Sequence, residues 1–500
     1  MSLPDGLVGE LALIVGPENV RTSPEDLMPF DCDALTQVRG SPDLVVMFRS
    51  AGEVAPVVKL LARAGVPFTA RGAGTGLAGG ATAIRGGAVL GLSRLKSILE
   101  LNPEGRYAVV EPGVVNLELT RAAEKAGLCF APDPASQSVC TIGGNVATNS
   151  GGPHTLKYGV TCDHILGLEV VLPDGETVVL GGACEDAPGL DLRALIIGSE
   201  GTMGIVTRIT VRLTPVPRAW KTLLAAFHSL EDATRAVSAM ISAGMIPAAL
   251  EIMDRRIVKA VEESFKLGLP LEAGAILIVE MDGLPQGMER AGDTAAALCR
   301  SQGAFIVRVA KDEAERAGLW QGRKKAAAAI GRVSPSYATH DVVIPRTRLP
   351  EAARRFVEME SKHGLRIGLL SHGGDGNLHP LIFYDERDPV QAEARRKISH
   401  EIARMAVELG GTVTGEHGIG VEKIEFMSEQ FTPDDLKVMR DLRDFIDPAG
   451  LCNPGKVLPP PGGGEVSSVS PATPADEISP ALKGRGGPAL GGADPPAGKP

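Results

Sequence analysis

The sequence is poor in aromatic residues, in closely spaced cysteines and in long apolar runs. Phe, Trp and Tyr make up 4% of its 500 residues, so aliphatic side chains have to form most of the core. The seven cysteines are scattered and never in C-x-x-C spacing, which disfavours an iron–sulfur cluster or zinc knuckle and predicts reduced thiols in the cytoplasm. No run reaches the roughly 18 apolar residues of a membrane-spanning helix, and the first residues lack the pattern of a secretory signal.

Positive charge is also in short supply. The net charge of -10 and the isoelectric point near 5.5 argue against binding to nucleic acid or to anionic lipid. The hydrophobic share of 44% and the mean hydropathy of +0.07 fit a soluble globular enzyme, and the length predicts two or three domains. A small anionic substrate would therefore need a locally built positive site.

Proline and glycine divide the chain into three parts. Between about residues 40 and 215, short strand-like segments alternate with amphipathic helical patterns, such as residues 53–65 and 117–127. Two prolines in TPVPRAW (214–220) end this region, and the helices and strands that follow are typical of an α+β module with an antiparallel sheet. Residues 459–500 hold 19 prolines and glycines and few large apolar side chains, which predicts a disordered tail.

The tract RGAGTGLAGG, residues 71–80, follows a predicted strand and matches the G-x-G-x-x-G pattern of Rossmann folds. A Rossmann site needs a helix directly after the glycines, but the sequence continues as LAGGATAIRGGAVLGLS, which has no helical pattern. A loose surface loop is a second interpretation. The third is a nest of backbone N–H groups that approaches a pyrophosphate closely, because glycine has no Cβ.

Two further tracts favour the pyrophosphate nest. Residues 132–159, PDPASQSVCTIGGNVATNSGGPHTLKYG, form a loop-like stretch with two Gly-Gly pairs and many small polar side chains. Residues 197–207, IGSEGTMGIVT, lead into a predicted strand. Hydroxyls, amides and free N–H groups of this kind suit a heteroatom-rich ring system with a ribityl chain.

In this order, the three tracts resemble the FAD-binding domain of flavoproteins of the vanillyl-alcohol oxidase (PCMH) type. The later segments SHGGDGNLHP, TGEHGIGVEK and DPAGLCNPGKVLP are similar to the C-terminal domain of FAD-linked D-2-hydroxy-acid dehydrogenases. With GRKKAAAAIGRVSPSY, the whole set most resembles the FAD-carrying catalytic subunits of bacterial glycolate oxidases, over roughly residues 20–458. The resemblance implies an α+β fold, with a two-subdomain FAD-binding domain (1–215) and a ferredoxin-like substrate and metal domain (216–458).

The resemblance also implies which residues bind FAD. They lie in the three glycine-rich tracts, and the first tract holds the pyrophosphate: Arg71, Gly72, Ala73, Gly74, Thr75, Gly76, Gly79, Gly80, Pro132, Asp133, Ser136, Gly143, Gly144, Asn145, Thr148, Gly151, Gly152, Glu200, Gly204 and Ile205. Some relatives attach FAD covalently through a histidine in the first tract. Thr75 and Gly76 stand near that place in this chain, so the sequence predicts non-covalent FAD.

Two histidines flank the glycine-rich turn of SHGGDGNLHP (371–380). The segments on either side have the pattern of adjacent strands, so the turn can bring His372 and His379 to one point, and TGEHG (414–418) adds Glu416 and His417. Two imidazoles and a carboxylate are typical of a catalytic metal centre with open positions, for which zinc, manganese or ferrous iron are suitable. The alternative is that the histidines are only hydrogen-bonded turn residues. The resemblance implies that His372, His379 and Glu416 are metal ligands and that His417 is the catalytic base.

A substrate carboxylate needs a fork-shaped cation. Arg323 in LWQGRKKAAAAIGR is the candidate, because a guanidinium binds a carboxylate through two parallel hydrogen bonds, and the resemblance implies an arginine there. Asn377 is a second candidate for substrate binding, with a purely conformational role in the turn as its alternative. Other polar residues nearby are predicted to be solvated or structural: Lys324, Lys325, Arg332 and His340.

The resulting hypothesis is FAD-dependent oxidation of a small 2-hydroxy acid, either glycolate to glyoxylate or, as the alternative, D-lactate to pyruvate. His417 is predicted to accept the hydroxyl proton, which a bound metal acidifies, while the α-hydrogen leaves as hydride to the flavin. Relatives that oxidise 2-hydroxyglutarate carry extra polar and basic residues near Ala327 and Thr339, and their absence here disfavours a dicarboxylate.

Reduced flavin needs an acceptor, either a partner subunit or quinone, because the chain has neither a cluster motif nor a credible NAD site. The resemblance implies a second FAD-type subunit and an iron–sulfur subunit that lead to membrane quinone, with peripheral attachment at the inner membrane through these partners. A zinc hydrolase in which Glu416 activates water is disfavoured by the FAD-type tracts. A non-catalytic FAD-binding scaffold is disfavoured by the complete set of His372, His379, Glu416 and His417.

Overall fold

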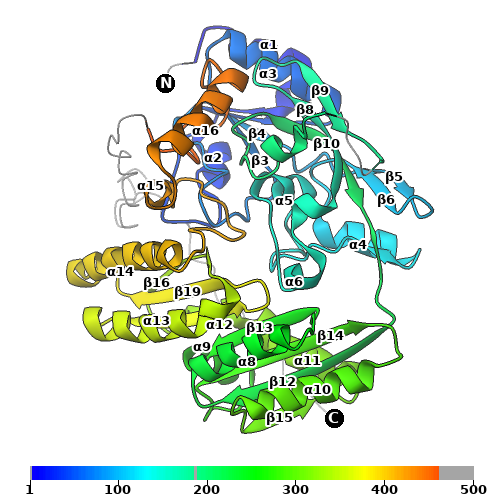
Figure 1. Ribbon diagram of the computed structural model, residues 1–500. Coiled ribbons are helices and arrows are strands. Elements are labelled where there is room, and N and C mark those ends of the chain that lie inside the picture. The colour runs from blue at the N-terminus through cyan, green and yellow to red at the C-terminus, as the bar shows by residue number, and fades with distance from the viewer. Residues whose placement is uncertain (1–2, 185–188, 461–500) are drawn as a thin grey trace, which may run out of the picture.

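Short apolar strands in the first 215 residues form two main sheets (Figure 1), and residues 128–129 pair with residues 214–215 as a small two-stranded sheet. The computed structural model describes residues 3–184 and 189–460. The first sheet has the order β1-β2-β4-β3, in which β2, β4 and β3 run parallel, and the second is antiparallel with the order β5-β6-β10-β8-β9. The strands are β1 (Val20–Arg21), β2 (Leu44–Met47), β3 (Phe68–Arg71), β4 (Ala88–Gly91), β5 (Ile98–Asn102), β6 (Tyr107–Val110), β7 (Leu128–Cys129), β8 (Ile165–Val171), β9 (Thr177–Gly181), β10 (Ile205–Arg212) and β11 (Thr214–Pro215).

Each of the two sheets has its own helices and its own core, so this domain consists of two subdomains, as predicted. Val57 and Leu61 of α3 are buried against the first sheet, while Leu119 of α4 and Val146 of α5 are buried against the second. An amphipathic helix is stabilised mainly by such burial of its apolar face. The helices are α1 (Leu7–Val15), α2 (Pro24–Leu27), α3 (Val54–Arg63), α4 (Asn116–Glu124), α5 (Ile142–Thr148), α6 (Thr155–Tyr158) and α7 (Arg193–Ile196).

The tract 132–159, predicted to be loop-like, contains the helices α5 and α6. The Thr141 side chain accepts a hydrogen bond from the Gly144 N–H at 3.2 Å and caps α5, while Ile142 and Val146 are buried in the core. The cap and the burial outweigh the low helix propensity of the Gly-Gly pair. The prediction of a continuous loop was wrong for these residues.

The second domain is built on one large antiparallel sheet with the order β15-β12-β14-β13-β18-β19-β16, and β17 also pairs with β19. Apolar side chains cover both faces, since α8, α10, α13 and α14 pack on one face and α9, α11 and α12 on the other. The strands are β12 (Ala219–Phe227), β13 (Ala249–Asp254), β14 (Ala275–Gly283), β15 (Ile306–Val309), β16 (Ser336–Thr339), β17 (Val342–Val343), β18 (Arg366–His372) and β19 (Asn377–Tyr384). The helices are α8 (Leu230–Ser242), α9 (Arg255–Phe265), α10 (Met288–Ser301), α11 (Glu313–Lys324), α12 (Ala326–Ile330), α13 (Leu349–His363), α14 (Pro389–Glu408), α15 (Met427–Gln430) and α16 (Pro433–Ile446).

The pairing of β13 with β18 joins two α+β units into this single sheet. Its register places Glu251 directly opposite His372. On the other side of β18, the hairpin with β19 places Leu370 opposite His379. The sheet therefore brings a buried carboxylate and two imidazoles to one end of three neighbouring strands.

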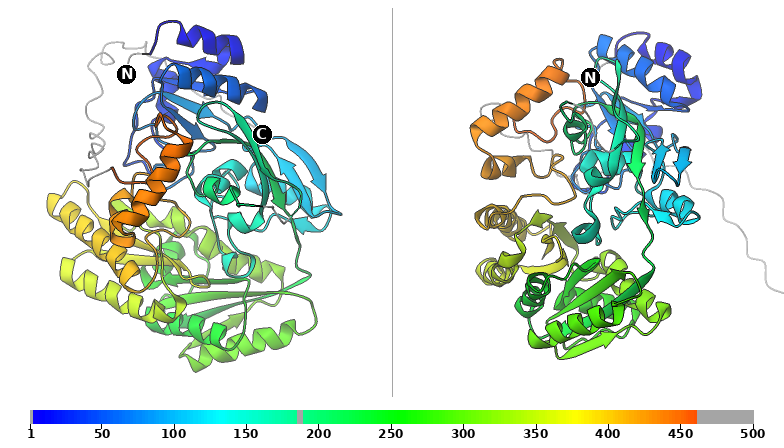
Figure 2. Two further views of the ribbon diagram at one scale, coloured as in Figure 1. Left: turned by 45° about the horizontal axis from the view of Figure 1, so that its top comes forward. Right: turned by 45° about the vertical axis from the view of Figure 1, so that its right-hand side comes forward.

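After α14 the chain returns to the first domain, where α16 lies beside it in both views (orange in Figures 1 and 2). The Phe68 N–H donates to Leu451 O at 2.9 Å, and the Asn453 N–H donates to Phe68 O at 2.8 Å. These bonds cover the open edge of β3 with a segment that follows the second domain in sequence. Most of the predicted tail, residues 461–500, lies outside the described residues. Within the described ranges, no helix combines the length and the apolarity needed to cross a membrane.

Candidate active site

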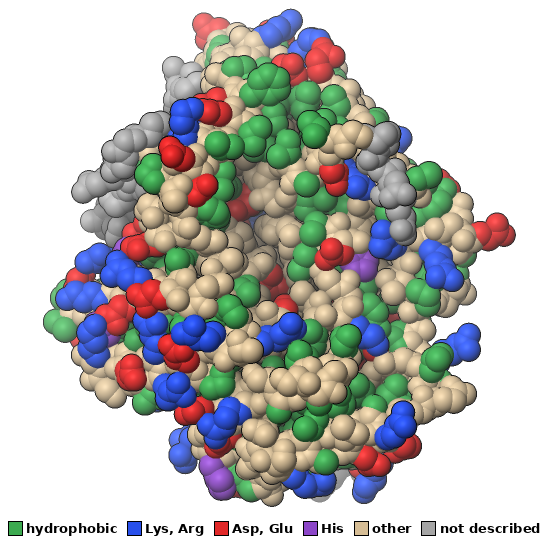
Figure 3. All heavy atoms as spheres, in the orientation of Figure 1, with side chains coloured by type: hydrophobic (Ala, Val, Ile, Leu, Met, Phe, Trp, Pro, Cys, Tyr) green, Lys and Arg blue, Asp and Glu red, His purple; other side chains and the backbone are tan. Residues whose placement is uncertain are grey.

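A cavity lies where the three glycine-rich tracts of the first domain meet, and Glu416 and His417 of the second domain also line it. The space-filling view shows the hollow between the two domains (Figure 3). The predicted FAD residues that line the cavity are Arg71, Gly72, Ala73, Gly74, Thr75, Gly76, Gly80, Ser136, Gly143, Gly144, Asn145, Thr148, Glu200 and Gly204. Segments far apart in the sequence therefore form one continuous wall.

The lining has the features of a site for a phosphate-bearing cofactor. A Cβ on Gly72 would lie 2.5 Å from Thr141 Oγ1, and one on Gly143 would lie 2.6 Å from Pro112 Cβ, so glycine permits the tracts to approach each other. Arg71 Nη1 is buried and has no hydrogen-bond partner among the described residues. An unpaired guanidinium nitrogen at a glycine-rich wall is a donor suited to a pyrophosphate.

Six of the predicted FAD residues do not line the cavity: Gly79, Pro132, Asp133, Gly151, Gly152 and Ile205. Several of them shape its wall from behind. Pro132 O accepts a hydrogen bond from Asn116 Nδ2 at 2.9 Å, and Asp133 Oδ2 lies 2.7 Å from His154 Nδ1. The sequence reasoning also missed lining residues outside the glycine positions, among them Asp33, Leu92, Cys140 and Ile196. Leu92 follows the first tract by one strand, β4, whereas β2, α3 and β3 separate Asp33 from it, and no local pattern marks either residue.

The structure brings the three predicted metal ligands together. His372 Nε2 and His379 Nε2 lie 3.2 Å and 3.4 Å from Glu416 Oε1. One ligand atom from each of the three residues lies within 4.8 Å of the others. Glu416 Oε2 is buried and has no hydrogen-bond partner among the described residues. The donor set of two nitrogens and one carboxylate fits a divalent transition metal with open positions.

Each imidazole also has a carboxylate on its other nitrogen. Glu251 Oε1 lies 2.7 Å from His372 Nδ1, and Asp341 Oδ1 lies 3.7 Å from His379 Nδ1. The Glu251 carboxylate fixes the His372 ring so that Nε2 points toward Glu416. His379 Nδ1 makes no hydrogen bond within the described residues. Burial opposes a charge on His372, but Glu251 and Glu416 outweigh it and raise the pKa of His372 well above its usual value. The negative charges of Glu251 and Glu416, which favour a protonated His372, would also favour a divalent cation between His372, His379 and Glu416.

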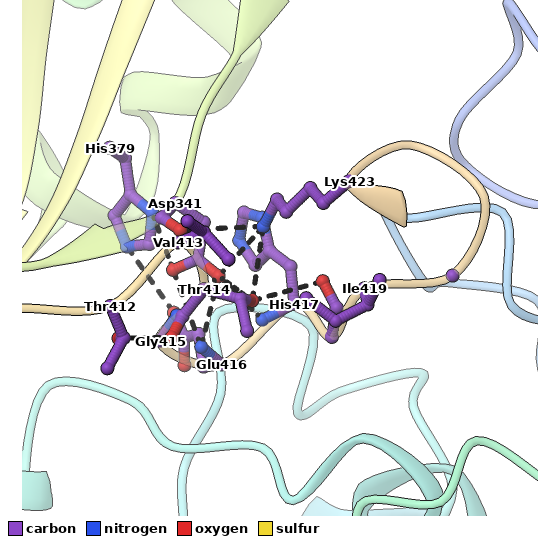
Figure 4. A network of polar contacts seen from close by, with 12 residues as sticks. Asp341, His379, Thr412, Val413, Thr414, Gly415, Glu416, His417, Ile419 and Lys423 are labelled. Carbon is purple, nitrogen blue, oxygen red and sulfur yellow. Dashed lines mark hydrogen bonds and ion pairs between the residues drawn. The ribbon is translucent and has the colours of Figure 1, made fainter. Parts of the chain in front are cut away.

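Asp341 organises the turn that carries Glu416 and His417 (Figure 4). Its Oδ2 accepts the backbone N–H groups of Gly415, Glu416 and His417 at 2.8, 3.1 and 2.9 Å, and Lys423 Nζ lies 3.2 Å away. Burial disfavours the charge, but Lys423 holds the pKa of Asp341 well below its usual value. Asp341, His379 and His417 also lie close enough to form a metal set, but the Asp341 carboxylate is already occupied by these donors.

His417 lines the cavity next to the metal set, and its ring stacks on that of His379 with a centroid distance of 5.1 Å. Burial lowers the pKa of His417 to about 4, so its imidazole is neutral near pH 7. A neutral imidazole can accept a proton.

Arg323 and Asn377 lie behind the metal set and do not line the cavity. Arg323 Nε is 2.6 Å from Glu251 Oε2, without hydrogen-bond geometry, so its guanidinium is paired with the carboxylate that also holds His372. Asn377 packs on the Glu416 turn, because a Cβ on Gly415 would lie 2.5 Å from Asn377 Nδ2, and its Oδ1 is buried without a partner in the described part of the chain. His340 Nε2 contacts Ser399 Oγ at 2.8 Å inside the second domain.

Two family models match the sequence. "FAD binding domain" matches residues 42–181, and "FAD linked oxidases, C-terminal domain" matches residues 216–457. The chain is 43% identical to the glycolate oxidase subunit GlcD of Escherichia coli K12 over 87% of each chain. It is 38% identical to GlcD of Bacillus subtilis over 90% of this chain and 96% of that one, and 34% identical to a D-lactate dehydrogenase of Anaerostipes hadrus over 84% and 90%.

Solved structures of similar fold include p-cresol methylhydroxylase with substrate bound, at a TM-score of 0.74 and 16% identity, covering 91% of this chain and 97% of that one. A second is 4-ethylphenol oxidase from Gulosibacter chungangensis, at a TM-score of 0.69 and 21% identity, covering 91% and 98%. These likenesses confirm the predicted PCMH-type fold, and the sequence relatives confirm the resemblance to glycolate oxidase catalytic subunits. The chain belongs to the FAD-linked oxidase family and is an FAD-linked oxidoreductase.

Proposed function

We propose that this protein oxidises a small 2-hydroxy acid, glycolate or D-lactate, where the glycine-lined cavity meets the histidine and glutamate set. One observation carries the proposal: Glu416 and His417 line the same cavity as the three glycine-rich tracts, so the candidate metal set adjoins the space that would hold FAD. The relatives named glycolate oxidase subunit and D-lactate dehydrogenase support a 2-hydroxy acid as the substrate. The location we propose is the cytoplasm.

The cavity wall would hold FAD without a covalent bond. Arg71 and the backbone of residues 72–76 would bind the pyrophosphate, and the second tract, including Ser136, Asn145 and Thr148, would line the rest of the cofactor. When bound, the flavin accepts the α-hydrogen of the substrate as hydride. No histidine lies in the first tract, so acid precipitation of the yellow protein should release the colour into the supernatant.

His372, His379 and Glu416 would hold a divalent metal, for which zinc is our first candidate and manganese or iron the alternatives. When bound, the metal lowers the pKa of the substrate hydroxyl and orients it. His417 would accept the hydroxyl proton on its ring, which burial keeps neutral near pH 7.

The substrate carboxylate would bind to the N–H groups of Arg323 that Glu251 does not contact, with the Asn377 amide beside them. Glu251 already balances the single charge of Arg323, so the guanidinium can donate hydrogen bonds to one substrate carboxylate but leaves no net charge for a second. This balance supports glycolate or D-lactate over 2-hydroxyglutarate.

Electrons would leave the reduced flavin through a partner. GlcD is named a subunit, which supports an assembly, and we propose a second FAD-type subunit and an iron–sulfur subunit. Attachment to the inner membrane face would then depend on these partners. Co-purification of the tagged chain with a cysteine-rich protein tests this point, and full quinone reduction by the isolated chain would contradict it.

An anaerobic titration tests the proposed reaction. The visible flavin band of the purified protein should bleach on addition of glycolate or D-lactate, and the acid that bleaches it at the lower concentration is the better substrate. Prior treatment with a chelator should abolish the bleaching, and added zinc should restore it. D-2-hydroxyglutarate serves as the comparison. A yellow protein that none of the acids bleaches would contradict the proposed substrate class.

A further inference from the structure

One carboxylate of the first domain holds the turn that carries Glu416 and His417. Glu200, in the third glycine-rich tract, accepts hydrogen bonds from the Ile419 N–H at 2.7 Å and from the Gly420 N–H at 2.9 and 3.1 Å. Its side chain is 6% exposed, and its own N–H donates to Ala147 O at 2.9 Å. A buried carboxylate that accepts backbone N–H groups of this kind is a strong, directional contact.

The parts around Glu200 fit together closely. A Cβ on Gly418 would lie 2.7 Å from Glu200 Oε1, and one on Gly80 would lie 2.8 Å from Glu200 Oε2. The turn also contacts the first tract directly, since the Val421 N–H donates to Ala78 O at 2.8 Å. Glycines on both sides of the carboxylate therefore let the metal-bearing turn and the cofactor-bearing tract approach it from opposite sides.

These contacts leave Glu200 little to offer a cofactor. Both of its oxygens already accept N–H groups from the second domain. The resemblance implies a role in FAD binding, whereas the geometry points to a role between the domains.

We propose that Glu200 is a positioning residue that fixes Glu416 and His417 relative to the FAD cavity and does not bind the cofactor through its carboxylate. This inference rests on the proposed function, in which the cavity holds FAD and the turn supplies a metal ligand and the base. A misplacement of reacting groups by about 1 Å lowers a rate by about 100-fold, so the contact matters for rate more than for affinity.

The variant Glu200→Gln tests the inference. Its amide keeps one acceptor oxygen, but its NH₂ group faces a backbone N–H that cannot accept a hydrogen bond. The FAD affinity of the apoprotein, measured by flavin fluorescence, should stay within about 3-fold of the wild type. The first-order rate of anaerobic flavin reduction at saturating substrate should fall about 10- to 100-fold. This combination separates positioning from cofactor binding.

Glu169→Gln is the matched control. Glu169 lies on β8 of the same domain, where its carboxylate accepts the Thr207 hydroxyl at 2.9 Å, and it does not line the cavity. It should leave both FAD affinity and reduction rate unchanged. Glu200→Asp, which keeps the charge but shortens the reach, replaces Glu200→Gln if the latter shows no cooperative thermal unfolding.

Failure of the role of Glu200 can be distinguished from failure of the proposed function. A loss of FAD affinity as large as the loss of rate, or an unchanged reduction rate, would overturn the role of Glu200. If glycolate and D-lactate fail to reduce the flavin of the wild type, the proposed function is wrong. The positioning role of Glu200 is then tested by zinc binding to the FAD-loaded protein. Weaker zinc binding in Glu200→Gln than in Glu169→Gln then supports the positioning role, and equal binding overturns it.

Discussion

At the scale of single residues, acids inside apolar strands organise the candidate metal set. Glu251 interrupts the buried strand ALEIMD, and Asp341 precedes the short strand β17. The glycine-rich turn between two strand patterns predicted that His372 and His379 meet, and the family resemblance added Glu416 to this set. The sequence did not predict Glu251 or Asp341, because only the register of strands distant in sequence places these acids beside the histidines.

Replacement of Glu251 by Gln should weaken metal binding. The neutral amide would replace the charged carboxylate as the partner of His372 Nδ1. Loss of such a carboxylate partner lowers metal affinity by about 10- to 100-fold. Competition with a chelating dye measures the zinc affinity. Glu280→Gln is the control, because Glu280 is equally buried on the adjacent strand β14 but pairs with Arg316 and Trp320. Equal zinc affinity in the two variants would contradict the assigned role of Glu251.

At the scale of elements, the short helix α6 joins the two domains. His154, just before α6, has Nδ1 2.7 Å from Asp133 Oδ2 and Nε2 3.6 Å from Glu280 Oε1 of the second domain. Within α6, Tyr158 donates to Asp282 Oδ2 at 2.5 Å, and Lys157 pairs with the same carboxylate. A four-residue helix has too little periodicity to be predicted, and its partners lie on a strand more than a hundred residues away.

The charge of His154 makes this junction sensitive to pH. Burial opposes protonation, but Asp133 and Glu280 outweigh it and raise the pKa of His154 to about 10 from the ordinary 6.5. Because the folded pKa is the higher one, the stabilisation is complete below about pH 6.5 and is lost as the pH rises towards 10. The melting temperature of the wild type should exceed that of His154→Gln most near pH 6. A difference that stays constant or grows up to pH 10 would contradict this assignment.

At the scale of the whole molecule, the strand and helix patterns predicted an α+β module with an antiparallel sheet, and the family resemblance of the motifs predicted the PCMH-type domain before it. They did not predict that residues 447–457 pack on the first domain. Lys456 Nζ donates to Thr82 O at 2.5 Å, and Asn453 Nδ2 donates to Gly80 O at 2.9 Å, so the end of the second family match supports the first glycine-rich tract. Contacts between segments so far apart in the sequence produce no local sequence pattern, so they could not be predicted.

A pair of truncated chains tests this support. A chain that ends at residue 460 keeps all of these contacts and should retain FAD affinity and melting temperature. A chain that ends at residue 446 loses Asn453 and Lys456, so the first tract loses several hydrogen bonds, each of which contributes about 1 kcal/mol. We expect it to lose FAD during gel filtration and to melt at lower temperature. Retention of FAD by the shorter chain would contradict the role of this segment.

The bonds between Phe68 and residues 451–453 also order events during synthesis. About 384 residues separate Thr69 from Asn453, and ribosomes add 5–20 residues per second, so roughly 20 to 80 s pass between the two. During that interval one edge of β3 remains unpaired, and an unpaired strand edge can pair with other nascent chains. The first domain is therefore complete only after residues 451–453 have been synthesised, and its yield in the cell should depend on chaperones that shield this edge.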